Sequence, residues 1–175
     1  MYEVDERDCV VELKDLPQSS VGAPIPHMLA DENRVVVAYY IEETRSSQDW
    51  TYVPSMSPQS FDELIAVVRF TGCASHMFGP PNDEAFRGHP LAGRGLHPYG
   101  VFRIEDSSWI RKLERMNSVH PYHRPETFWK RQHLIFSFHD STFECVCDGF
   151  DVRRMRGSIA GIVTDMVKLL EWDRS

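Results

Sequence analysis

The sequence has no long apolar run and little positive charge. No stretch of its 175 residues approaches the roughly 20 apolar residues of a membrane-spanning helix. The opening MYEVDERDCV is acidic, where a secretion signal would be basic and then apolar. With 19 Lys and Arg residues against 26 Asp and Glu residues, the formal charge is −7, which argues against broad nucleic-acid binding. We therefore expect a cytoplasmic protein with no membrane partner.

Short motifs with a defined chemistry are also missing. There is no C-x-x-C, H-x-x-x-H or H-E-x-x-H spacing and no phosphate-binding G-x-x-x-x-G-K-[ST] loop. The four cysteines, Cys9, Cys73, Cys145 and Cys147, are expected to be free thiols. No cofactor is expected. The alternative is a divalent metal held by His, Asp and Glu side chains from distant segments.

The hydrophobic content of 42% is enough for a single domain with one sizeable core. Runs of β-branched and aromatic residues predict strands, and amphipathic patterns behind capping residues predict helices. The expected class is α+β, a mainly antiparallel sheet of about five or six strands with two or three helices largely on one face. Strands are predicted over 7–14, 34–42, 50–53, 65–70 and 100–105, and helices over 61–64, 108–118, 125–132 and 158–171.

Residues 133–150 predict a β-hairpin whose two strands share one apolar face. Alternation places Leu134, Phe136 and Phe138 on that face of the first strand, so the loop must hold an even number of residues if Phe143, Cys145 and Cys147 are to match them. The polar face could simply be open to solvent, as in many antiparallel sheets. The expected neighbours are Phe138 with Phe143, Phe136 with Cys145, Leu134 with Cys147, His139 with Thr142, Ser137 with Glu144, and His133 with Asp148.

The segment from Cys73 to Tyr99 holds three histidines, adjacent carboxylates, four glycines and four prolines, and it predicts a long functional loop. We expect this 73–99 loop to cover the polar face of the hairpin, because its apolar residues need a docking surface. His139 and Glu144 would then share a cleft with at least one loop histidine, and a carboxylate beside an imidazole can orient it for proton transfer or metal binding. The candidate catalytic residues are His139, Glu144, His89 and Asp83. The candidate ligand-binding residues are His76, Asn82, Asp83, Glu84, Arg87, His89, His97, His133, Ser137, His139 and Glu144.

Three functions remain open at this point. The first is a small cytoplasmic ligand- or partner-binding protein, an accessory or immunity-type factor, that uses the loop and the polar face of the hairpin. The alternative is an enzyme with a His/carboxylate acid–base or metal site in a pocket under the loop. The third is self-association into a homo-oligomer, with Met77, Phe78 and Tyr99 of the loop as apolar anchors.

Two strings, FGPPNDEAFRGHP at 78–90 and FHDSTFEC at 138–145, resemble segments of a group of uncharacterised bacterial proteins. Those proteins share the order of strand, long loop, tryptophan-containing helix and final hairpin over most of the chain. The resemblance implies a bacterial source. It implies no activity, cofactor or site residue.

Overall fold

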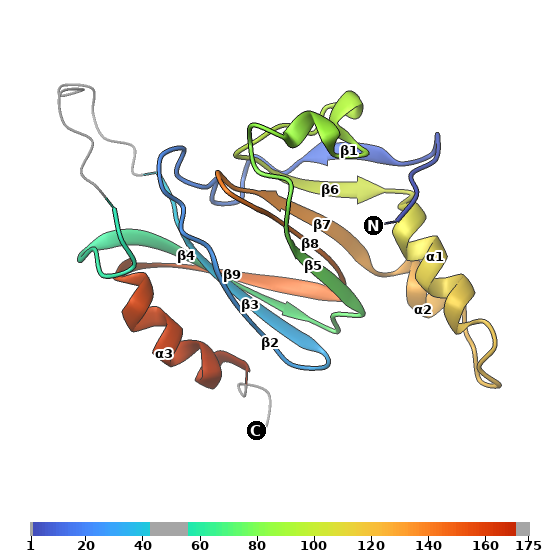
Figure 1. Cartoon of the computed structure of the whole chain (residues 1–175). Coiled ribbons are helices and arrows are strands. Elements are labelled where there is room, and N and C mark those ends of the chain that lie inside the picture. Colours follow the sequence, from blue (N-terminus) through green and yellow to red (C-terminus); the bar gives the residue numbers. More distant parts are fainter. Residues whose placement is uncertain (1, 43–55, 171–175) are drawn as a thin grey trace.

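Two antiparallel sheets are stacked face to face in the computed structural model, which describes residues 2–42 and 56–170 (Figure 1). The four-stranded sheet has the order β2 (His27–Ala30), β3 (Arg34–Tyr40), β4 (Glu63–Thr71) and β9 (Gly149–Gly157). The five-stranded sheet has the order β1 (Cys9–Glu12), β6 (Val101–Glu105), β7 (Gln132–Ser137), β8 (Thr142–Cys147) and β5 (Ser75–Gly79). The α+β class expected from the sequence is confirmed, with two sheets in place of one.

Both faces of the four-stranded sheet are covered. Alternate residues of β3, such as Val37 and Tyr39, face the five-stranded sheet, while their neighbours Val36 and Tyr40 pack under helix α3 (Ile159–Leu170). Burial on both sides explains why β3 is a continuous apolar run and not an alternating one.

The hairpin of β7 and β8 presents the predicted apolar face to the core between the sheets. Its register, however, is shifted by two residues from the expected one, because Ser137 lies opposite Thr142 and Phe136 opposite Phe143. The turn runs from Phe138 to Ser141 and is closed by the Phe138 N–H, which donates to the Ser141 carbonyl at 2.8 Å. A two-residue shift leaves every side chain on its face, so the face assignment is right and the expected neighbours are wrong. Glu144 lies opposite Ile135, and His133 opposite Val146.

The outer face of the five-stranded sheet is covered by α1 (Ser108–Asn117), α2 (Glu126–Trp129) and the loop that holds the 3-10 turns η1 (Phe86–Gly88) and η2 (Ala92–Arg94). The helices therefore lie on opposite sides of the stacked sheets (Figure 1). The helix predicted over 61–64 is wrong, because β4 begins at Glu63, and the strand predicted over 50–53 lies outside the described residues. Strands β2, β5 and β9 were not predicted. None of the helices described is long and apolar enough to cross a membrane.

Candidate functional site

The 73–99 loop covers the outer face of the hairpin. After β5, which pairs with β8 at the edge of the sheet, the chain crosses back over β7 and β6. Phe86 and Leu91 dock on Phe102 and Ile135 in a buried cluster, so the loop is held by apolar anchors. The polar side chains beneath it are consequently cut off from solvent.

Glu144 is the centre of a buried hydrogen-bond network under this loop. One carboxylate oxygen, Oε1, is 3.0 Å from His89 Nε2, and the other, Oε2, is 3.2 Å from His133 Nε2. The Tyr2 hydroxyl donates to Oε2 at 2.8 Å. The side chains of His89 and His133 are fully buried, and that of Glu144 is 4% exposed. An ionised carboxylate in such surroundings is stable only if its oxygens are hydrogen-bonded, and here three donors surround it.

The second nitrogen of each histidine fixes its proton. The Leu91 N–H donates to Nδ1 of His89 at 3.1 Å, which assigns the ring proton to Nε2, facing Glu144. Nδ1 of His133 is 2.8 Å from the Ser107 hydroxyl, which caps α1 by accepting the Ile110 N–H. A neutral His133 accepts from Ser107 and donates to Glu144, which satisfies every group.

Burial governs the protonation states of this network. Desolvation lowers the pKa of His133 and favours the neutral ring, although Glu144 acts in the opposite direction. Burial on its own would raise the pKa of Glu144, but the hydrogen bonds from His133 and His89 outweigh it and lower that pKa from 4.5 to about 2. Burial and the charge of Glu144 raise the pKa of Tyr2. The network is therefore an ionised carboxylate held by neutral donors.

Two members of the network were not expected to be part of it. Tyr2 stacks on Trp109, with ring centroids 5.1 Å apart, and meets the His133 ring edge-on at 5.2 Å. Tyr2 is 131 residues from His133 along the chain, and no local pattern connects them. Ser107 carries the ordinary signature of a helix cap, which does not indicate that its hydroxyl also reaches a buried histidine.

His139, the expected partner of Glu144, instead contacts Asp140 at 3.1 Å and Asp83 at 3.9 Å near the surface. Asp83 accepts a short hydrogen bond from the Tyr99 hydroxyl, which lowers the pKa of Asp83. Burial, followed by this hydrogen bond, raises the pKa of Tyr99 to about 12. The structure thus places the predicted residues in two groups, a buried one around Glu144 and a partly exposed one around Asp83.

The remaining predicted residues have local roles or point to solvent. The Ser137 hydroxyl is buried and bonds to the backbone of His97 and Gly100. His97 itself lies 3.4 Å from Glu12. His76 lies on β5 opposite Cys145, the Asn82 side chain accepts the Ala85 N–H, and Glu84 and Arg87 are exposed.

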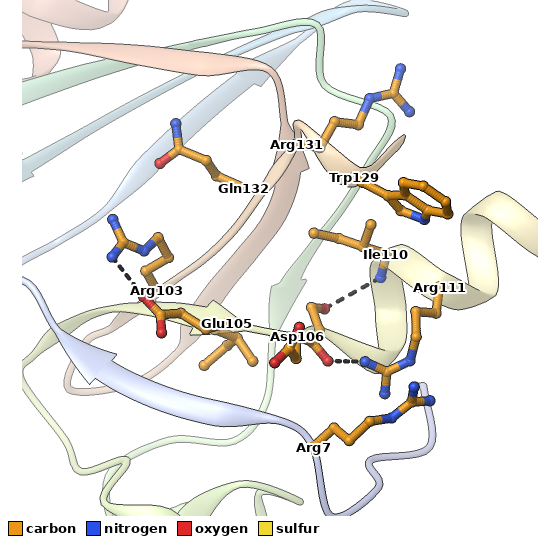
Figure 2. Close-up of a pocket in the computed structure, with 11 residues that line it drawn as sticks. Arg7, Arg103, Glu105, Asp106, Ile110, Arg111, Trp129, Arg131 and Gln132 are labelled. Carbon is orange, nitrogen blue, oxygen red and sulfur yellow. Dashed lines mark hydrogen bonds and ion pairs between the residues drawn. The ribbon is translucent and has the colours of Figure 1, made fainter. Parts of the chain in front are cut away.

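An open groove of about 470 Å³ lies beside α1 (Figure 2). Its wall includes four arginines, two acidic residues and an indole ring that is 64% exposed. Figure 2 shows Arg7 and Arg111 on one side of the groove and Trp129 with Arg131 on the other. Its charged and aromatic lining residues are Arg7, Arg103, Glu105, Asp106, Arg111, Trp129 and Arg131.

The turn from β6 into α1 forms part of this groove. Asp106 has the left-handed backbone conformation, with φ of 49°, and directs the chain from the strand into the helix. Its carbonyl accepts a short hydrogen bond from Arg111, and Ser107 follows at the border of the groove. The Ser107 hydroxyl therefore connects the wall of the groove to the buried His133.

The arginines of the groove already have partially exposed partners. Arg103 is 2.9 Å from Glu105, Arg111 is 2.6 Å from Asp5, and Arg131 is 3.0 Å from Asp148. The carboxylates of these pairs are 45 to 58% exposed, so water and salt weaken the attraction. Each guanidinium carries five N–H donors, and a single carboxylate does not use them all. The groove can therefore exchange water for an anionic group.

No group of three or more His, Cys, Asp or Glu side chains within residues 2–42 and 56–170 is placed to hold a metal ion. Comparison of the chain with protein-family models, curated proteins and solved structures found no match.

Proposed function

We propose that this protein binds a ligand or partner through the groove beside α1, and that the recognised group is a phosphate or carboxylate. The observation that supports this most directly is the meeting of four arginines in one open groove of a chain whose formal charge is −7. Planar guanidinium groups match the oxygens of carboxylate and phosphate in bidentate geometry. The exposed ring of Trp129 adds a flat surface for an aromatic or apolar part of the ligand.

The burial of the hairpin's polar face supports placing recognition in the groove and not on that face. His89, His133 and Glu144 satisfy one another beneath the 73–99 loop and offer no donor or acceptor to solvent. Their role in this proposal is to hold the loop, β8 and α1 together, which keeps the wall of the groove in place. The accessory or immunity-type role stays part of the proposal as one setting for such binding.

Acid–base catalysis is the alternative, and the contact of Ser107 with both the groove and His133 is the observation that favours it. Three observations support binding instead. The Ser107 hydroxyl is engaged as the cap of α1, and the His133 side chain has no exposed surface. The backbone N–H of Ser108, which follows Ser107, already donates to Asp8 at 2.7 Å. A nucleophilic serine would need that N–H, or another like it, for the developing oxyanion.

Calorimetric titration with phenyl phosphate, benzoate and the neutral benzyl alcohol tests the proposal. We expect the anions to bind and the alcohol not to bind. Replacing Arg103 or Arg7 by Gln should weaken the binding of phenyl phosphate about tenfold or more, because a hydrogen bond to a charged group is lost. Arg87→Gln, in the exposed turn η1 away from the groove, is the matched control and should bind as the wild type does. The proposal would be refuted if the wild type bound no anion at millimolar concentration. It would also be refuted if both Arg103→Gln and Arg7→Gln bound phenyl phosphate as tightly as the wild type does.

A further inference from the structure

The turn between α1 and α2 projects from the molecule (Figure 1). Large apolar side chains in and beside this turn are exposed. Residues 115–122 are exposed without interruption. Met116, in the last turn of α1, is 66% exposed, and Val119 and Tyr122 of the turn are 89% and 84% exposed. We call residues 115–124 the α1–α2 tip. Large apolar side chains this exposed on a projecting turn are unfavourably solvated, and covering them by another surface would be favourable.

The tip is an organised turn. The Ser118 N–H donates to the Arg115 carbonyl at 3.2 Å, and the His120 N–H donates to the Asn117 carbonyl at 3.0 Å. His123 Nε2 lies 2.7 Å from Glu114 Oε1, which ties the returning chain to α1. The apolar side chains are therefore presented together by a fixed backbone.

The surroundings of the tip are basic, although the chain as a whole is acidic. Residues 111–131 contain six Lys and Arg residues and two Glu residues, a net formal charge of +4 in a chain of −7. Four of the six basic residues are exposed: Lys112, Arg115, Arg124 and Lys130. The tip itself combines its apolar side chains with Arg115 and Arg124 and contains no acidic residue.

We propose that the α1–α2 tip docks on a lipid bilayer that carries anionic headgroups. Val119 and Met116 would enter the boundary between headgroups and acyl chains, where the amphipathic ring of Tyr122 is also stable. The surrounding Lys and Arg residues would lie at the headgroups, and each contributes attraction to anionic lipid. A projecting tip suits a deformable bilayer. Contact between two copies of the tip would bring like charges together.

This inference concerns a peripheral contact and is independent of the groove. The absence of a spanning helix from the described residues bears only on transmembrane insertion. The groove is lined by residues from the start of α1, whereas the tip follows the end of that helix, and neither proposal requires the other.

Co-sedimentation of the full chain with vesicles tests the inference. The probes are vesicles of phosphatidylcholine alone and of phosphatidylcholine with an equal amount of phosphatidylglycerol. We expect partition into the anionic vesicles at low salt, with at least a tenfold decrease in 0.5 M salt or on neutral vesicles. The double variant Val119→Ser/Tyr122→Ser should reduce partition about tenfold. Lys112→Gln/Arg115→Gln should also reduce it more than tenfold, because each cation contributes about fivefold.

Val21→Ser is the matched control, since Val21 is 51% exposed and lies outside the tip. It should partition as the wild type does, and urea unfolding should show that all variants are folded. No partition of the wild type into anionic vesicles would overturn the inference. It would also be overturned if Val119→Ser/Tyr122→Ser partitioned as strongly as the wild type, or if the wild type partitioned equally into neutral and anionic vesicles.

Discussion

Replacing Glu144 by Gln tests the idea that an ionised carboxylate holds the buried network together. The substitution keeps the shape of the side chain but leaves a single acceptor oxygen where the Tyr2, His89 and His133 donors converge. Burial at 4% exposure means that water cannot replace the lost acceptor. Since the pKa of Glu144 falls from 4.5 to about 2 on folding, the ionised form contributes about 3 kcal/mol to the free energy of unfolding. We expect Glu144→Gln to lose about this amount at pH 7.

The pH dependence gives the sharper test. A carboxyl whose pKa is lowered on folding contributes its full stability above the unfolded pKa of 4.5 and loses it as the pH falls toward about 2. Gln resembles the protonated carboxyl, so the difference between the two proteins should shrink to less than half of its pH 7 value at pH 3.

Urea unfolding followed by tryptophan fluorescence at pH 7 and pH 3 provides the measurement. Glu84→Gln, at an exposed position of the same loop region, is the control and should change stability by less than about 0.5 kcal/mol. The reasoning is refuted if Glu144→Gln costs less than about 0.5 kcal/mol at pH 7, or if its cost is the same at both pH values.

Three further predictions concern the core and the thiols. Tyr2→Ala should cost about 3–5 kcal/mol in urea unfolding and Tyr2→Phe about 1–3 kcal/mol, with p-cresol restoring part of the loss in the alanine variant only; an equal cost for both would contradict the role of the stacked ring. Phe136→Ala should cost about 3–5 kcal/mol, and Ser137→Ala about 1–3 kcal/mol because its buried hydroxyl bonds to backbone groups; a neutral Ser137→Ala would contradict these bonds. With a thiol reagent, the folded protein should react quickly at Cys9 alone and the unfolded protein at four thiols, whereas fewer than four would contradict the free cysteines.

Alternation predicted which face each hairpin residue occupies but could not predict the register. The period of two fixes only whether the loop length is even, so offsets that differ by two residues are equivalent in hydrophobic pattern. In the structure the turn runs from Phe138 to Ser141 and is closed by the hydrogen bond from the Phe138 N–H to the Ser141 carbonyl. The ring of Phe138 still packs on Tyr39, with ring centroids 5.1 Å apart. This packing between sheets has no counterpart in the local sequence.

The candidate site was predictable in part. The sequence indicated that a long loop would cover Glu144 and bring a histidine to it, and His89 does lie there. The choice of His89 over the other histidines depends on where Phe86 and Leu91 dock, which is a tertiary contact. The contribution of Tyr2 comes from the other end of the chain, and the groove beside α1 combines arginines from four separate segments. Neither leaves a periodic or spacing signal.

The order of strands in the two sheets has a consequence for synthesis on the ribosome. Strand β8 joins β5 to β7, and β9 completes the edge of the four-stranded sheet beside β4. Neither sheet has its full set of neighbours until residues 142–157 have left the ribosomal exit tunnel. Until then, β4 lacks its neighbour β9 and β5 lacks its neighbour β8, so each strand has an unpaired edge, and the apolar face between the two sheets is not fully covered. A pause in translation before residue 142 would therefore prolong the time during which the nascent chain is prone to aggregate.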